Sequence, residues 1–205
     1  MKISVIIPVY NAEKYVTNAV ESALQFDEVF EVILVEDKSP DNALEVCKAL
    51  AEKHEKVKLF QHPDKGNHGA GASRNLGIKA ASGEYIAFLD ADDFYLPNRF
   101  DAERKIFKNP DVDGVYGALG VHYWNIKAKE QYFPVYGEKL TTVYKMHAPI
   151  NVFAGLLGMR GSFGLIHLDC LTVKNSALEK MDDLMKTELK LHQDTDFLMR
   201  LAFYT

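Results

Sequence analysis

The first half of the chain alternates between short apolar runs and longer segments with a helical repeat. The apolar runs are rich in valine and isoleucine, as is typical of strands buried on both faces, and they lie at 3–9, 32–35, 57–60 and 85–89. Between them, apolar residues recur every three or four positions, which predicts amphipathic helices around 16–24, 41–51 and 72–83. Strand and helix therefore alternate three times with short connections, as in a parallel α/β sheet with right-handed crossovers.

Beyond Pro97 the pattern is looser. We expect an aromatic-rich irregular stretch at 127–150, strands at 114–123 and 165–173, and helices at 100–107, 178–190 and 195–204. The last helix has no stop signal before Thr205. We therefore expect the chain to be truncated inside that helix, and we predict a single compact α/β domain.

Composition narrows the class of protein. The chain has 205 residues, 47% hydrophobic and 26% charged, which is ordinary for a globular domain that needs no disulfide or metal to fold. The 24 basic and 29 acidic residues give a net charge of −5, which argues against nucleic-acid binding.

Location is predicted from two absences in the sequence. No apolar stretch approaches the roughly 18–20 residues that a membrane span requires. The two cysteines, Cys47 and Cys170, lack the spacing of a metal site or redox motif, which favours a reducing compartment over the alternative of a single disulfide. We expect a soluble, cytoplasmic chain, with the inner face of the membrane as a possible working place.

Polar side chains follow the predicted strands at the edge where parallel sheets bind ligands. Tyr10 follows the first strand, Asp37 the second, and Asp90 and Asp92 the fourth. Unpaired buried carboxylates are costly, which disfavours a pure packing role. The alternative is solvated loop acids that cap helices.

Asp90 and Asp92 stand two positions apart after a wholly apolar strand. In an extended chain such residues point to the same side. Two carboxylates on one side suit a hard divalent cation, Mn²⁺ or Mg²⁺, whose remaining positions take phosphate oxygens.

The segment Gly69-Ala70-Gly71 invites comparison with dinucleotide-binding loops. That fingerprint follows a first strand, whereas this one follows the third, and its third glycine position holds Arg74. We interpret the loop as a turn that begins a helix and presents Arg74 to a bound phosphate. A surface salt bridge is the alternative for this arginine.

Four segments, VIIPVYN, VEDKSPD, GAGASRNLGIKAASGEYIAFLDADD and HQDTDF, resemble the family 2 glycosyltransferases of the inverting GT-A class. The resemblance is dense from Ile3 to about Pro97 and returns near Asp194. It implies a Rossmann-like, mostly parallel sheet flanked by helices on both faces. It also implies a nucleotide-sugar-binding half at 1–97 and an acceptor-binding half at 98–205.

The resemblance assigns the donor side of the site. Asp37 matches the acid that hydrogen-bonds the nucleotide base, Tyr10 the aromatic beside it, and Pro8 and Val9 the wall of the base pocket. In the D-x-D motif, Asp92 would be the direct metal ligand. Asp90, also a potential ligand, would lie nearer the ribose.

The resemblance also assigns a general base, with one departure. The late motif is usually Glu-Asp, and here it is Gln193-Asp194. Asp194 would take the acceptor's proton, Asp196 is its rival, and a helix cap is the structural alternative. Among the other candidates, His167 is expected to be structural. The aromatic group Tyr123, Trp124, Tyr132, Phe133 and Tyr136 forms either an acceptor wall or simple packing.

The implied reaction is inverting sugar transfer from a nucleotide-diphosphate donor, most often UDP-linked, to a saccharide or lipid-linked saccharide hydroxyl in polysaccharide assembly. Two alternatives stay open. A sugar nucleotidyltransferase would carry a basic Gly-rich loop after the first strand, where this chain has PVYNAEKY. A non-catalytic nucleotide-sugar-binding module is favoured by Gln193 and by the truncated end.

Overall fold

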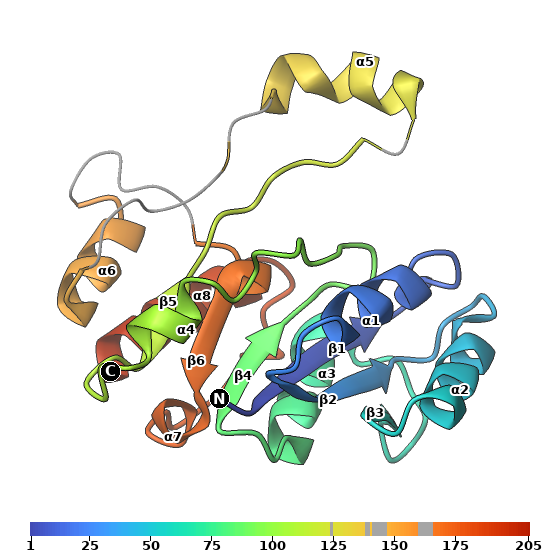
Figure 1. The fold of residues 1–205 in the computed structure, drawn as a ribbon, viewed down its shortest axis with the longest axis horizontal. Helices are drawn as coiled ribbons and strands as arrows, with labels where there is room; N and C mark the ends of the chain where they lie inside the picture. The colour runs from blue at the N-terminus through green and yellow to red at the C-terminus, as the bar shows by residue number, and fades with distance from the viewer. Residues whose placement is uncertain (124, 138–139, 141–146, 160–165) are drawn as a thin grey trace.

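The computed structural model describes residues 1–205 except 124, 138–139, 141–146 and 160–165. Its strands are β1 (Ile3–Val9), β2 (Val29–Glu36), β3 (Val57–Gln61), β4 (Tyr85–Phe88), β5 (Gly114–Tyr116) and β6 (Leu171–Lys174). They form one mixed sheet in the order β3-β2-β1-β4-β6-β5 (Figure 1). The first four strands are parallel, β6 is antiparallel to β4, and β5 is antiparallel to β6.

Helices cover both faces of the sheet, as predicted (Figure 1). The helices α1 (Val16–Leu24) and α2 (Ala43–Lys53) pack on one face, where every second residue of β1, beginning with Ile3, is fully buried. The helices α3 (Gly69–Ala80) and α8 (Gln193–Tyr204) pack on the other face, together with Ile6 and Phe88. Burial on both faces explains why β1 reads as a continuous apolar run.

The strand order reverses at β1, whose neighbours are β2 on one side and β4 on the other. Such a reversal opens a crevice at the carboxyl ends of the parallel strands. Because β6 runs in the opposite direction, its first residue, Leu171, lies at this same carboxyl edge. The short 3₁₀ turn η1 (Leu168–Cys170) precedes it.

The predicted helix at 178–190 is wrong. The helix α7 (Asn175–Leu178) ends where it should begin, and turns and bends follow. Side chains from elsewhere satisfy the backbone of this loop. The Asn75 side-chain amide both donates to and accepts from the backbone of Met185, at 2.8 and 2.9 Å, and the Arg200 guanidinium donates to the carbonyl of Leu184 at 2.5 Å. Tertiary hydrogen bonds thus replace helical ones.

Other elements of the second half differ in extent. The strand expected at 114–123 has three residues, the strand expected at 165–173 begins at Leu171, and Leu165 lies outside the described residues. The expected irregular stretch contains α5 (Ile126–Tyr136) and α6 (Pro149–Leu156). The helix α8 is close to the predicted 195–204, whereas α4 (Glu103–Ile106) covers only four of the eight residues predicted at 100–107.

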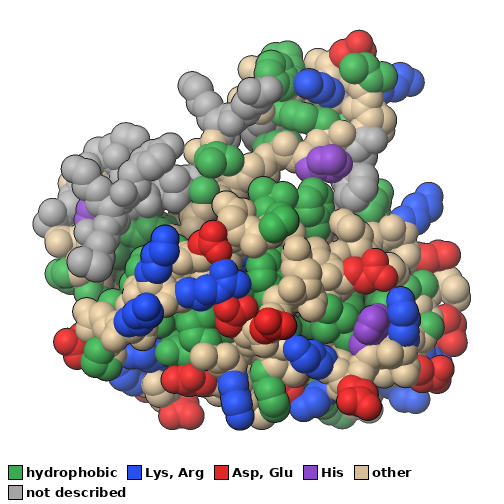
Figure 2. Space-filling view, in the orientation of Figure 1, with side chains coloured by type: hydrophobic (Ala, Val, Ile, Leu, Met, Phe, Trp, Pro, Cys, Tyr) green, Lys and Arg blue, Asp and Glu red, His purple; other side chains and the backbone are tan. Residues whose placement is uncertain are grey.

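The surface is mixed in charge. Lysine and arginine side chains are interspersed with aspartate and glutamate on the face shown in Figure 2. Within the part of the chain that the structure describes, no helix combines the length and apolar character needed to cross a bilayer.

Candidate functional site

A cavity of about 240 Å³ opens at the carboxyl edge of the parallel strands. All seven residues that the sequence assigned to the donor and metal side line it: Pro8, Val9, Tyr10, Asp37, Arg74, Asp90 and Asp92. They come from the ends of β1, β2 and β4 and from α3. The structure therefore brings together residues that are up to 84 positions apart, counting from 8 to 92.

A second cavity, of about 220 Å³, adjoins the first. It shares Arg74 and Asp90 with the first cavity, and Lys190, Gln193 and Asp194 also line it. His167 lines it too, so this histidine does reach the site. The two cavities meet at the Arg74–Asp90 pair.

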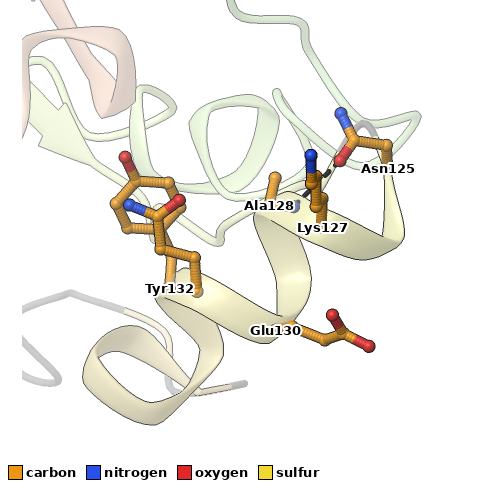
Figure 3. A pocket seen from close by; sticks show the side chains of 6 residues that line it. Asn125, Lys127, Ala128, Glu130 and Tyr132 are labelled. Atoms are coloured by element: carbon orange, nitrogen blue, oxygen red, sulfur yellow. Dashed lines mark hydrogen bonds between the residues drawn. The ribbon is translucent and has the colours of Figure 1, made fainter.

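A larger hollow, of about 650 Å³, lies along α5 (Figure 3). Six residues of one short stretch, from Asn125 to Tyr132, line it. Its polar contact is the helix cap in which the Asn125 side chain accepts from the backbone N–H of Ala128 at 2.9 Å. Since no second element adds converging polar groups among the lining residues that the structure describes, we place the candidate site at the carboxyl edge instead.

The predicted aromatic wall is only partly described. Tyr132 and Phe133 are exposed on α5, and the ring of Phe133 lies 6.1 Å from that of Tyr123. Trp124 and the side chain of Tyr136 lie outside the described residues. The acceptor role of this group stays a prediction.

Asp37 organises the glycine-rich loop. Its buried carboxylate accepts hydrogen bonds from the backbone N–H groups of His68 and Gly69, at 2.7 and 2.8 Å, and from the Asn67 side chain at 3.0 Å. His62 lies 3.5 Å away. The carboxylate therefore fastens the start of α3 to the end of β2, which is the capping role held open above for these acids. Its contact with a nucleotide base stays a prediction.

Arg74 projects from α3 into both cavities. Its guanidinium donates to the Asp90 carboxylate at 2.5 Å, and its side chain is 11% exposed against 32% for Asp90. The salt bridge expected as the alternative role thus forms, but within the cleft and not on the outer surface. A mostly buried arginine at the meeting point of two cavities can also bind phosphate oxygens.

The acidic segment after β4 is a turn, which corrects the extended geometry assumed from the sequence. The strand ends at Phe88, and the backbone N–H of Asp93 donates to the carbonyl of Asp90 at 3.1 Å. In a turn, residues three apart approach one another. Asp93 therefore joins Asp90, while Asp92 is exposed and lines the first cavity.

The pKa of Asp92 is also shifted by its surroundings. Neighbouring protein displaces water from the Asp92 carboxyl, and this desolvation, together with the negative charges of Asp93 and Asp90, raises its pKa. Clustered carboxylates of this kind favour a bound cation, which would relieve the repulsion among them.

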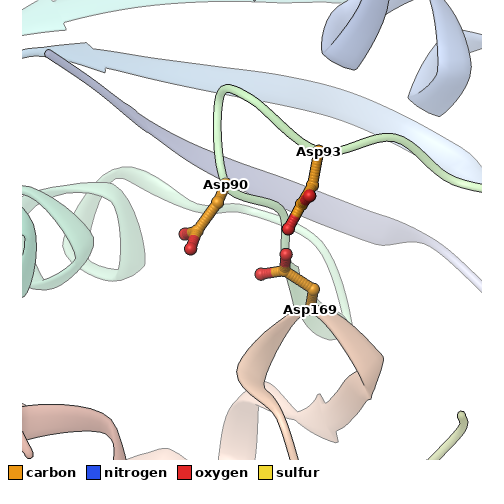
Figure 4. A group of neighbouring side chains, drawn as sticks. All are labelled: Asp90, Asp93 and Asp169. Atoms are coloured by element: carbon orange, nitrogen blue, oxygen red, sulfur yellow. The ribbon is translucent and has the colours of Figure 1, made fainter. Parts of the chain in front are cut away.

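One functional candidate, Asp169, has no signal in the sequence. Carboxylate oxygens of Asp90, Asp93 and Asp169 lie within 4.8 Å of one another (Figure 4). Asp169 is 4% exposed, and desolvation followed by the charges of Asp90 and Asp93 raises its pKa well above its usual range. It precedes a strand, and only the antiparallel direction of β6 brings it to the carboxyl edge. An all-oxygen donor set fits Mg²⁺ or Mn²⁺.

Asp194 lies in the first turn of α8 and lines the second cavity. His192 precedes the helix in the left-handed conformation, with φ of 61°. The rival, Asp196, is held by an ion pair to Arg200 at 2.6 Å and lines neither cavity at this edge. Geometry therefore favours Asp194 for chemistry on a ligand.

Gln193, which replaces the usual glutamate, packs against the glycine-rich helix. Its amide donates to the carbonyl of Leu189 at 2.6 Å. A Cβ placed on Gly71 would lie 2.5 Å from the Gln193 side-chain oxygen, so a larger residue here would displace the glutamine side chain. The pair joins the start of α8 to the start of α3.

The fold is that of the GT-A type. The carboxyl edge of its Rossmann-like sheet carries an acidic turn, an arginine and a separate carboxylate. Residues 4–165 match Glycosyl transferase family 2, and the chain belongs to that family.

Curated relatives agree. The chain is 36% identical over 135 residues to glycosyltransferase GlyG of Streptococcus pneumoniae, which covers 65% of this chain and 43% of that protein. It is 40% identical over 97 residues to a poly(ribitol-phosphate) beta-glucosyltransferase of Bacillus spizizenii, covering 46% of this chain and 15% of that protein. The chain thus spans less than half the length of these relatives.

Solved structures share the fold. S. aureus TarS (residues 1–349) in complex with UDP-GlcNAc has a TM-score of 0.75 at 23% identity, over 100% of this chain and 54% of TarS. The mannosyltransferase PcManGT of Pyrobaculum calidifontis, in complex with GDP-Man and Mn²⁺, has a TM-score of 0.63 at 18% identity. The overlap with the latter covers 96% of this chain and 51% of that one.

Proposed function

We propose that the protein transfers a sugar from a nucleotide-diphosphate donor, most simply a UDP-sugar, to an acceptor hydroxyl, with inversion and with the help of a divalent cation. The observation that carries the proposal is the pair of adjoining cavities, which meet at Arg74 and Asp90. One cavity has the donor-side residues and the other has Asp194. This arrangement suits a reaction between two bound molecules.

The donor would occupy the 240 Å³ cavity. In this proposal Tyr10, Pro8 and Val9 border the base, and Asp37 contacts it while holding the glycine-rich loop. Arg74, already charged and mostly buried, binds the diphosphate. The TarS complexes with UDP and UDP-GlcNAc support this choice of ligand.

The acidic turn would hold the cation, with Asp90 and Asp92 as ligands. When bound, a divalent cation stabilises the negative charge that develops on the departing nucleotide diphosphate. Mn²⁺ in the mannosyltransferase complex supports the choice of metal. The protein's own net charge of −5 does not oppose an anionic donor, because the cation supplies positive charge locally.

Asp194 would act as general base. It would accept the proton of the acceptor hydroxyl while that oxygen attacks the anomeric carbon on the face opposite the leaving group. One displacement of this kind inverts the carbon without a covalent enzyme intermediate. Gln193 would hold the start of α8 through its contact with Leu189.

The acceptor is proposed as a saccharide or a lipid-linked saccharide in polysaccharide assembly. The poly(ribitol-phosphate) beta-glucosyltransferase supports a polymeric acceptor. In this scheme residues 1–97 bind the donor and residues 98–205 contact the acceptor. Both cysteines are buried free thiols, which supports a reducing, cytoplasmic location.

The test begins with calorimetric titration of UDP in the presence and absence of Mn²⁺. We expect UDP binding that requires the cation and that weakens in Asp92→Ala. A screen of UDP-, GDP- and dTDP-sugars for hydrolysis and transfer by the full-length protein then identifies the donor.

Absence of nucleotide binding, or undiminished binding in Asp92→Ala, contradicts the donor and metal assignment. Binding without turnover supports the non-catalytic module, which Gln193 favours, and pyrophosphate release from UTP and a sugar phosphate supports a nucleotidyltransferase.

A further inference from the structure

A buried carboxylate without a hydrogen-bonding partner lies behind the acidic turn. The Asp169 side chain is 5% exposed, and among the residues that the structure describes neither of its carboxylate oxygens has a hydrogen-bond partner. The nearest histidine nitrogen, Nδ1 of His167, lies 3.9 Å away. Buried polar atoms are nearly always hydrogen-bonded, so this carboxylate needs an explanation.

The nearby Arg99 does not supply the missing hydrogen-bond partner of Asp169. The Arg99 guanidinium donates to the backbone carbonyls of Asp169 and Leu171, both at 3.2 Å, and to the Thr172 hydroxyl at 3.1 Å. It also forms an ion pair with Glu103, a second buried acid. The Arg99 guanidinium is therefore directed to Glu103 and to the backbone, and the Asp169 carboxylate faces Asp93 and Asp90 instead.

The direction of the side chain indicates what is missing. Figure 4 shows the Asp169 carboxylate pointing toward Asp93 and Asp90, and oxygens of all three lie within 4.8 Å of one another. Oxygens bound to one hard cation at about 2.0–2.6 Å are separated by up to roughly 4–5 Å. Three carboxylates at this spacing match one face of a single coordination sphere.

We propose that Asp169 is an inner ligand of the divalent cation at this site, and that Asp169, Asp93 and Asp90 form its protein-facing side. Asp92 then lies on the donor side of the ion. The inference rests on the proposed function only in placing the cation at the donor site. It makes the second half of the chain part of the metal centre, because Asp169 precedes β6.

The test measures the cation alone, without nucleotide. Mn²⁺ is titrated into the protein and free Mn²⁺ is followed by electron paramagnetic resonance, for the natural chain, Asp169→Asn and Asp93→Asn. Removal of a ligand is expected to weaken Mn²⁺ binding at least about 10-fold in each variant. Asp101→Asn removes an equally charged but exposed carboxylate, and it is expected to leave Mn²⁺ affinity unchanged.

Thermal unfolding is the second measurement. If Asp169 is a ligand, the effect of Asp169→Asn on the melting temperature differs between EDTA and Mn²⁺. In EDTA, Asp169→Asn is expected to melt at or above the temperature of the natural chain, because it replaces a buried acid that faces Asp90 and Asp93 with a neutral side chain. In Mn²⁺, the natural chain is expected to gain stability and the variant to lose most of that gain. Asp93→Asn provides the same comparison if Asp169→Asn fails to fold.

Two results overturn the proposal: Mn²⁺ affinity within twofold of the natural chain in both ligand variants, or no Mn²⁺-induced rise in the natural chain's melting temperature. The second result points instead to a proton shared between Asp169 and Asp93. If Mn²⁺ binds as expected but UDP does not, the metal centre stands and the proposed function fails. If UDP-sugar turnover is lost in Asp169→Asn while Mn²⁺ affinity is retained, the inference fails and the proposed function stands.

Discussion

Two buried carboxylates at opposite ends of the sheet, Glu31 and Asp169, differ in their hydrogen-bond partners. At the amino end, Glu31 accepts hydrogen bonds from the Ser4 hydroxyl, from the backbone N–H and hydroxyl of Ser82, and from Lys58, at 2.6–2.9 Å. Burial raises its pKa, but these bonds together outweigh burial and lower the pKa to about 2. At the carboxyl end, Asp169 has no such partner among the residues that the structure describes, and burial raises its pKa well above the usual range.

The difference separates an acid that the fold holds in place from one that we propose as a metal ligand. Glu31 is 1% exposed and ties β1, β2 and β3 to the turn before β4. Asp169 is nearly as buried, yet it faces the carboxylates of Asp90 and Asp93. Strongly perturbed groups without a structural partner concentrate at functional sites. Changes at the amino end should therefore cost stability, and changes at the carboxyl end should cost binding or activity.

The largest expected effect is on activity, at the carboxyl end. Asp194→Asn should lower sugar transfer by about 10²–10⁴-fold, because the amide cannot accept the acceptor's proton. The melting temperature should stay within a few degrees of the natural chain. Initial rates with the donor found in the screen, together with thermal unfolding, check both statements. Asp196→Asn is the matched control, and a greater loss in that variant would reassign the base.

The next effect is on stability, at the amino end. Glu31→Gln should lower the free energy of unfolding by about 3 kcal/mol, the equivalent of a pKa held near 2 instead of 4.5. The glutamine amide would also face the Lys58 ammonium, donor against donor. Urea unfolding at pH 7 measures the change. Mn²⁺ affinity equal to that of the natural chain shows that the two ends are independent, whereas coupled loss would contradict the comparison.

A pH series sharpens the same contrast. The folded-state pKa of Glu31 is lowered, so its contribution is fully present above the unfolded value of 4.5 and is lost as pH falls toward about 2. The stability gap between the natural chain and Glu31→Gln should therefore shrink by about 2 kcal/mol between pH 7 and pH 3. Urea unfolding of both proteins across this range isolates the single carboxyl. A gap that does not change with pH would show that Glu31 is not held as a charged group.

The smallest expected effect concerns the charged partner of Glu31. The Lys58 side chain is 46% exposed, so water screens its ion pair. Lys58→Met should cost about 1 kcal/mol or less, because the three donors from Ser4 and Ser82 remain. A double-mutant cycle with Glu31→Gln gives the coupling energy. A loss as large as that of Glu31→Gln would mean that the charge pair, and not the hydroxyl and backbone donors, stabilises this end.

The first half of the fold could be predicted from sequence because its signals are local. The run 3–9 matches β1 residue for residue, and the helical repeat at 16–24 matches α1. A strand buried on both faces is mostly apolar, and an acid that follows such a parallel strand lies at the carboxyl edge of the sheet. The donor-side cavity therefore contains every residue assigned to it from sequence.

The structure of the second half of the chain depends on tertiary contacts that the sequence pattern does not show. The apolar positions at Leu178, Met181 and Met185 have helical spacing and are buried, but the backbone of this segment is held by Asn75 and Arg200 from elsewhere. The acidic turn likewise replaced an expected extended segment. The local spacing of apolar residues does not reveal whether the backbone of a segment forms helical hydrogen bonds or bonds to distant side chains.

By itself, the sequence determined the family, through its motifs, and the four parallel strands with their intervening helices, because burial shows in the pattern of neighbouring residues. It also placed the polar residues that follow these strands at one edge of the sheet. Only the tertiary structure decided that Asp93 and not Asp92 approaches Asp90, and that Asp169 joins them. The physical reasons are a turn that brings residues three apart together, and a sixth strand running against the fourth. That reversal places the start of β6, and the buried carboxylate before it, beside the ends of the parallel strands.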